Sequence, residues 1–159
     1  MSTRTSRRLI GAKSRLGLKT ERPVRVFVAM SFRAEEEPEL VDYFEAMKRA
    51  CLATKLPIEL VRIDLVEGDY EISQKIMDEI DEADIVLADF TLSPANVYFE
   101  LGYARGCKRR IIQTARRGAK LEFDARNWRT IFYRNATELE ESLKSALNDA
   151  YAETVETSE

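Results

Sequence analysis

Two acidic residues occupy positions where a simple solvent-facing role is not expected. Asp89 ends an apolar run, and Glu100 lies between Phe99 and Leu101 in a segment with helical spacing. A carboxylate beside apolar packing costs free energy unless it finds partners, and such costs are common where a site needs the group. The 159 residues include no histidine. Ser-His-Asp catalysis, Cys-His catalysis and His-ligated metal sites are therefore excluded.

Carboxylates without histidine suit the cleavage of a bond at the anomeric carbon of a sugar. The transition state there resembles an oxocarbenium ion, which a carboxylate stabilises or bonds covalently. A second acid orients a sugar hydroxyl or handles the proton of the leaving group. An N-glycosidic bond is a good candidate, because the leaving base is activated by protonation or already carries charge. Phosphoryl transfer is disfavoured, since no Gly-rich phosphate loop is followed by Lys-Ser/Thr.

Short apolar runs alternate with helically spaced segments along the chain, which predicts right-handed βαβ crossovers. The expected fold class is a three-layer α/β/α arrangement, with a mostly parallel, flavodoxin-like or Rossmann-like sheet of about five strands. Strands are expected at Val24–Met30, Ile58–Leu65, Asp84–Phe90, Arg110–Ala115 and Thr130–Tyr133. Helices are expected at Glu37–Lys55, Glu71–Ala83, Asn96–Lys108 and Thr137–Tyr151.

Polar residues follow the first three expected strands. Ligands of open parallel sheets bind beyond the carboxyl ends of the strands, so these residues are expected to converge at one edge. The candidate catalytic acids are Asp89 and Glu100, whose side chains are expected to share a cleft. The candidate substrate-binding residues are Met30, Ser31, Phe32, Asp69, Ser93, Asn96 and Tyr98. No set of metal ligands is expected.

The helix that carries Glu100 has a clear start signal in the sequence. Serine is a good N-cap and proline suits the first helical position, which points to Ser93 and Pro94. Helical spacing places one apolar stripe toward the sheet and leaves Glu100 at the border of core and cleft. That stripe consists of Val97, Leu101 and Ala104.

Structural roles for the same residues remain open. Glu100 in a solvated position would point to water or pair with Arg105 or Lys108. Asp89 has an alternative role as a turn or capping residue. Ser93 fits a cap better than a nucleophile, and Tyr98 fits packing as well as ligand stacking.

The net charge of −3 conceals an uneven distribution. Residues 1–22 carry seven basic residues and one acid, a charge of +6, which leaves −9 for the remainder. We expect residues 1–22 to be a flexible basic arm, 23–152 to be one domain, and 153–159 to be a disordered acidic tail. The arm also resembles an organellar transit peptide in composition.

Two cysteines make a disulfide framework improbable and fit a reducing cytoplasm. No run of apolar residues approaches the roughly 18 needed to span a bilayer. We therefore expect a cytoplasmic protein without a membrane partner, and nucleic acid as a partner only through the basic arm.

Four segments together resemble the superfamily of nucleoside 2-deoxyribosyltransferase-like and TIR-like domains. They follow in the family's order and span residues 24–133, although the Asn-Pro-Asn helix entry is Pro-Ala-Asn here. The segments are VFVAMSF (Val26–Phe32), IMDEIDEADIVLADFT (Ile76–Thr91), NVYFELGYARGCKRRII (Asn96–Ile112) and FDARNWRTIFY (Phe123–Tyr133).

The resemblance implies that Glu100 of the ELG motif is the catalytic carboxylate and that Asp89 assists the leaving base. It implies cleavage or transfer at an N-glycosidic bond of NAD, a nucleoside or a nucleotide, without a cofactor, and a role in bacterial antiviral defence. It also implies a homo-oligomer or a partner effector protein. The alternative is a non-catalytic nucleotide-sensing or assembly module of the same fold.

Overall fold

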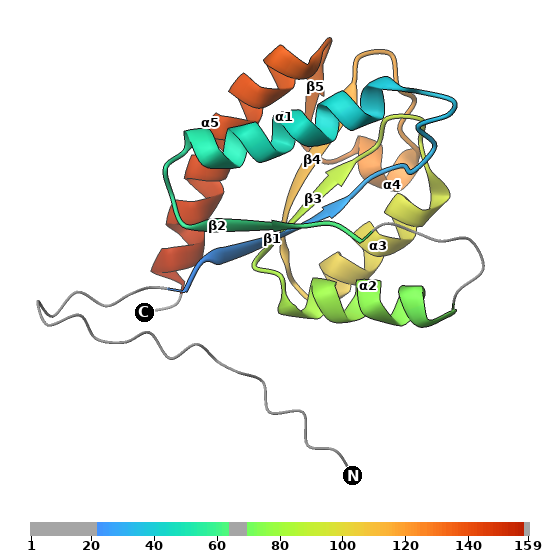
Figure 1. Ribbon diagram of the computed structural model, residues 1–159. Coiled ribbons are helices and arrows are strands. Elements are labelled where there is room, and N and C mark those ends of the chain that lie inside the picture. Colours follow the sequence, from blue (N-terminus) through green and yellow to red (C-terminus); the bar gives the residue numbers. More distant parts are fainter. Residues whose placement is uncertain (1–21, 64–69, 158–159) are drawn as a thin grey trace, which may run out of the picture.

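The computed structural model describes residues 22–63 and 70–157. Five short runs rich in apolar and β-branched residues form one sheet, in which all neighbouring strands are parallel. The strand order is β2-β1-β3-β4-β5 (Figure 1). The strands are β1 (Val24–Ala29), β2 (Ile58–Val61), β3 (Ile85–Asp89), β4 (Arg110–Arg116) and β5 (Thr130–Tyr133).

Helices cover both faces of the sheet. One pair, α1 and α5, packs side by side on one face, and α2 and α3 lie on the other (Figure 1). The helices are α1 (Glu39–Ala53), α2 (Tyr70–Glu82), α3 (Ala95–Gly106), α4 (Phe123–Arg126) and α5 (Ala136–Glu156). This is the expected three-layer α/β/α class, with five strands in the sheet.

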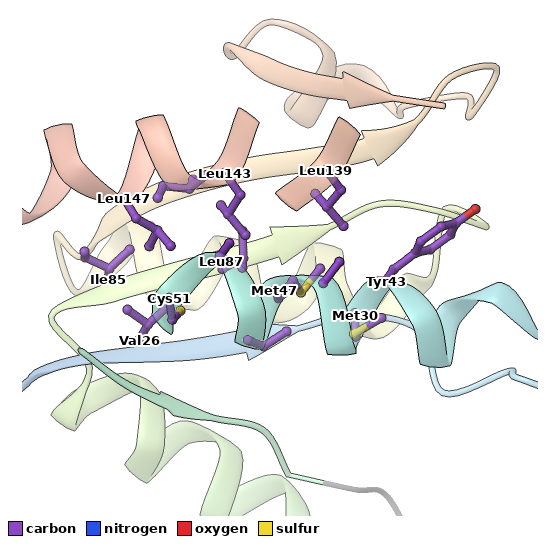
Figure 2. Packing of buried hydrophobic residues seen from close by; sticks show 14 of the residues in the cluster. Val26, Met30, Tyr43, Met47, Cys51, Ile85, Leu87, Leu139, Leu143 and Leu147 are labelled. Carbon is purple, nitrogen blue, oxygen red and sulfur yellow. The ribbon is translucent and has the colours of Figure 1, made fainter. Parts of the chain in front are cut away.

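The first core lies between the sheet and the α1–α5 pair. Leucines at four-residue intervals on α5, at 139, 143 and 147, lie on one side of that helix and point at the sheet (Figure 2). Ile85 and Leu87 of β3 meet them, because alternate residues of a strand face the same side. Replacing one such buried leucine by alanine typically costs 2–5 kcal/mol.

The second core lies on the opposite face. Val86 and Ala88 of β3 pack here against Val97, Leu101 and Ala104 of α3. The predicted sheet-facing stripe of this helix is therefore confirmed. The alternation along β3 also fixes a parity: odd-numbered residues face α1 and α5, and even-numbered residues face α2 and α3.

Two features of the helices differ from the expectations. Helix α5 continues to Glu156, four residues past the expected domain end at residue 152, and Arg110 pairs with Glu153 in its last turns. The disordered tail therefore does not begin at residue 153. Helix α4 was not expected, since a four-residue helix leaves no periodic signal. No helix in residues 22–63 and 70–157 has the length and apolar character to cross a bilayer.

Candidate functional site

The strand order creates one distinctive position on the sheet. The chain leaves β1 for β2 on one side and then returns to place β3 on the other side of β1. In open parallel sheets a crevice forms at such a switch point, outside the carboxyl ends of the strands, and ligands bind there. The segments that follow β1 and β3 therefore border the candidate site.

The connection from β3 to α3 has an unusual backbone. Leu92 and Ser93 have φ angles of 66° and 44°, in the left-handed region that non-glycine residues rarely adopt. Each such residue costs on the order of 1–2 kcal/mol, and strain of this kind concentrates at functional sites. The strained turn directs the chain from the sheet edge into the helix that carries Glu100.

The start of α3 differs from the sequence-based expectation. Pro94, not Ser93, takes the N-cap position, and no side chain caps the helix. The left-handed backbone of Ser93 directs its hydroxyl elsewhere, and its Oγ lies 3.0 Å from the hydroxyl oxygen of Tyr98. Tyr98 also accepts a 2.7 Å hydrogen bond from the backbone N–H of Glu122 and packs on Phe90. Both residues therefore hold the helix entry in place.

Glu100 is a buried carboxylate with little compensation. Glu100 is 5% exposed, and the Asn96 side-chain amide donates a long hydrogen bond of 3.4 Å to its Oε1. Burial raises the pKa of Glu100 to about 7, and the Asn96 hydrogen bond opposes this shift only in part. Glu100 does not take up the alternative ion pair with Arg105, whose guanidinium binds Gln113 at 2.6 Å.

Asp89 is also buried, but both oxygens of its carboxylate accept hydrogen bonds. Oδ1 accepts a 3.0 Å bond from the Thr91 N–H, and Oδ2 accepts bonds from the hydroxyls of Thr114 at 2.6 Å and Tyr133 at 2.9 Å. Burial raises the pKa of Asp89, and these three donors counteract the shift. Burial and the neighbouring Asp89 charge raise the pKa of Tyr133, so its phenol keeps the proton that it donates.

The two acids approach the edge of the sheet from opposite faces. Asp89 shares the parity of Leu87 and bonds to Tyr133, which belongs to the core under α1 and α5. Glu100 lies on α3, whose buried stripe packs on the other face. The structure therefore brings Glu100 together with Asn96, but it brings Asp89 together with β4 and β5. A cleft shared by both carboxylates stays a prediction.

The other predicted residues divide between the core and the rim. Met30 is fully buried in the α1–α5 core. Ser31 is buried, and its Oγ accepts a 3.2 Å bond from the N–H of Arg33. The half-buried Phe32 ring lies 4.8 Å from the guanidinium of Arg62. Asp69 lies outside the described residues.

One arginine that the sequence does not single out, Arg33, connects the two loops of the crevice. The Arg33 guanidinium donates a 3.0 Å hydrogen bond to the carbonyl of Leu92, inside the strained turn, and pairs with Glu36. No periodic pattern in the sequence predicts this contact, because the partner of Arg33 is the backbone carbonyl of Leu92, 59 positions away. Within the described residues, no cluster of three or more His, Cys, Asp and Glu side chains could hold a metal ion.

Comparison with known proteins supports the fold. The chain matches no protein-family model and no curated protein. Among solved structures, it resembles the CMP N-glycosidase BcmB of Clostridium botulinum with a TM-score of 0.53 and 18% identity, over 75% of this chain and 97% of that one. It also resembles a 2-deoxyribosyltransferase of Bacillus psychrosaccharolyticus with a TM-score of 0.55 and 13% identity, over 73% and 90% of the two chains. The fold is therefore nucleoside 2-deoxyribosyltransferase-like.

Proposed function

We propose that this protein cleaves or transfers at the N-glycosidic bond of a nucleotide-type substrate, with Glu100 as the catalytic carboxylate. The observation that carries the proposal is the buried, poorly compensated Glu100 on the helix that leaves the switch-point edge of the sheet. A buried carboxylate that lacks a matching partner is typical of active sites. The activities named for the two similar folds belong to the same class of chemistry.

In this proposal the ionised Glu100 acts on the anomeric carbon. It either bonds to that carbon or stabilises its positive charge while the carbon–nitrogen bond breaks. The bond's electron pair leaves with the base, and water or a second base then takes the sugar. Asn96 holds one oxygen of Glu100 and so orients the carboxylate. Ser31 and Phe32 border the substrate from the loop after β1.

Asp89 acts in this proposal as a positioning residue. Its three hydrogen bonds join the end of β3 to β4 and β5, and the neighbouring Thr91 leads into the strained turn before α3. Direct assistance to the leaving base by Asp89, which the family resemblance implies, stays a prediction.

The substrate class is tested by product analysis. The purified full-length chain is incubated at high concentration with NAD, ribonucleosides, deoxynucleosides and their monophosphates, and the products are resolved by mass. We expect a free base, or nicotinamide from NAD, together with the matching sugar product. Absence of product from every substrate in the panel would contradict the proposal. A role in antiviral defence stays a prediction.

A second candidate function is nucleotide sensing without turnover, and the state of Asp89 favours it. An acid whose oxygens both serve internal hydrogen bonds is poorly placed to deliver a proton. The same panel separates the two functions when it is read by thermal shift as well as by mass. Stabilisation by one nucleotide without products supports the sensor.

A further inference from the structure

Two neighbouring pockets share Trp128 as a lining residue. The first, of about 430 Å³, lies at the end of α3 and the start of β4. The second, of about 560 Å³, is lined by residues of β5 and of the chain that precedes this strand. Both volumes suit a ligand of nucleotide size. None of the predicted site residues lines either pocket. The two pockets together are called the basic strip below.

The first pocket concentrates positive charge. Arg105, Lys108, Arg109 and Arg129 line it, and no acidic residue does. None of the ion pairs between described residues involves any of these four cations. The guanidiniums of Arg105 and Arg109 bind neutral acceptors instead, the Gln113 side chain and the backbone carbonyl of Asp81. Arg109 is the least free of the four, since it also helps to lower the pKa of Asp84.

This local charge contrasts with the rest of the folded chain. Residues 23–159 carry a net charge of −9, and other arginines have carboxylate partners, as Arg116 has Glu37 and Arg49 has Glu140. The second pocket adds Lys120 and Arg126, of which Arg126 is already engaged in an interaction, and Glu122 is its acidic lining residue. An acidic protein that leaves several cations together has a surface suited to an anion.

The basic strip also exposes aromatic rings. Trp128 is 56% exposed and Phe132 is 43% exposed. The Arg105 guanidinium lies 3.6 Å from the centre of the indole and so steadies the ring from one side. Thr130 and Phe132, alternate residues of β5, line the second pocket together with Trp128, which lies in the bend before the strand. The two exposed rings therefore border the same pocket.

We propose that the basic strip binds single-stranded nucleic acid. Cations distributed over both pockets match a chain of phosphates better than a single anion. Exposed aromatic rings between cations provide stacking platforms for unpaired bases, which is how non-specific single-strand binders work. In a double helix the faces of the bases are already stacked on one another, so they are not free to stack on these two rings. This site is separate from Glu100 and does not depend on the proposed catalytic function.

The test measures binding of fluorescein-labelled dT20, rU20 and the dT20·dA20 duplex by anisotropy, from 50 to 300 mM NaCl. The full-length chain is compared with the double variant Lys108→Glu/Arg129→Glu and with Trp128→Ala. The matched charge control is Lys48→Glu/Lys144→Glu, on exposed positions of α1 and α5. Every protein keeps the basic N-terminal residues, so differences report on the basic strip.

We expect Lys108→Glu/Arg129→Glu to weaken oligonucleotide binding at least tenfold at 50 mM NaCl. The control double variant Lys48→Glu/Lys144→Glu is expected to bind more than tenfold tighter than Lys108→Glu/Arg129→Glu. Loss of two phosphate contacts lowers the slope of log affinity against log salt by about 1.4. Trp128→Ala weakens binding by roughly tenfold, and Trp128→Phe restores most of it.

Four results would overturn the proposal. The first is no binding of either oligonucleotide at 50 mM NaCl, and the second is equal affinity of the basic-strip variants and the charge control. The third is equal affinity for single-stranded and double-stranded DNA. The fourth is a change of mass by light scattering in the Trp128 and Arg129 variants with unchanged oligonucleotide binding, which would assign this surface to contacts between copies of the chain.

Discussion

Glu100 carries a free-energy cost that can be estimated at the scale of a single residue. Burial raises its pKa from 4.5 to about 7, which corresponds to about 3 kcal/mol when the carboxylate is ionised. A raised pKa means that the folded state holds the proton more tightly than the unfolded state does. This contribution to stability is therefore fully present below pH 4.5 and is lost as the pH rises through about 7.

Glu100→Gln is therefore expected to stabilise the fold in a pH-dependent way. Glutamine has a similar shape but carries no charge, so the gain in free energy of unfolding approaches about 3 kcal/mol at pH 8 and becomes small at pH 5. Urea denaturation at the two pH values measures it. Glu141→Gln, at an exposed position on α5, should stay within about 0.5 kcal/mol at both. A Glu100→Gln gain that is the same at pH 5 and pH 8 would show that the carboxylate is well solvated.

Tyr133 supports the second acid by donating to a buried charge. Tyr133→Phe removes the 2.9 Å bond to Asp89 Oδ2, and hydrogen bonds to charged groups contribute about 1.5–3 kcal/mol. We expect Tyr133→Phe to lower the free energy of unfolding by about 2 kcal/mol in chemical denaturation. Tyr103→Phe removes a 2.8 Å bond to the exposed Asp81 and should cost less than about 1 kcal/mol. Equal losses in the two variants would argue against a buried, hydrogen-bonded Asp89.

At the scale of elements, helix ends carry information that the apolar pattern lacks. Helix α1 ends at Ala53, and the exposed Lys55 just beyond it has a φ angle of 58°. Glycine adopts this backbone without steric cost. Lys55→Gly is therefore expected to raise the free energy of unfolding by about 1 kcal/mol. Lys144→Gly, in the interior of α5, should lower it by about 1 kcal/mol. Denaturation midpoints that shift in opposite directions in the two variants would confirm both predictions. A lower free energy of unfolding in Lys55→Gly would contradict the first.

Element order was predictable from sequence because period and length are local signals. Strand β5 was predicted at the residues where it is found, and the apolar stripe of α3 was identified correctly. The cap of α3 was not, because the left-handed turn at Leu92 and Ser93 uses neither glycine nor asparagine and so has no sequence signature. Helix α4 was too short to show a period.

The arrangement of the two acids needed the fold as well as the sequence. Chain order predicts that Asp89 and Glu100 both lie near one edge of the sheet. The parity of β3 decides which face Asp89 points to, and the choice of face by α3 decides the side of Glu100. The local pattern of α3 does not show which face of the sheet this helix covers, so the sequence alone does not place Glu100 relative to Asp89. Thr114 and Tyr133, the partners of Asp89, come from two further strands.

At the scale of the whole molecule, the strand order places the loops after β1 and β3 at one switch point. Arg33 links these loops through the Leu92 carbonyl, and the Asp89 network ties β3 to β4 and β5. The core under α1 and α5 supports this edge from one face, and α3 carries Glu100 on the other. Segments from the whole described chain therefore fix the position of one carboxylate.

The most direct test is the rate of base release from pH 5 to pH 9, for the unmodified chain and for Glu100→Gln, on the substrate that the product analysis identifies. An ionised Glu100 must act, so kcat/KM of the unmodified chain is expected to rise with pH through about 7 and then level off. Glu100→Gln is expected to be at least roughly 1000-fold slower at every pH, with its fold intact by circular dichroism. Base release by Glu100→Gln at the rate of the unmodified chain would contradict the assignment of Glu100.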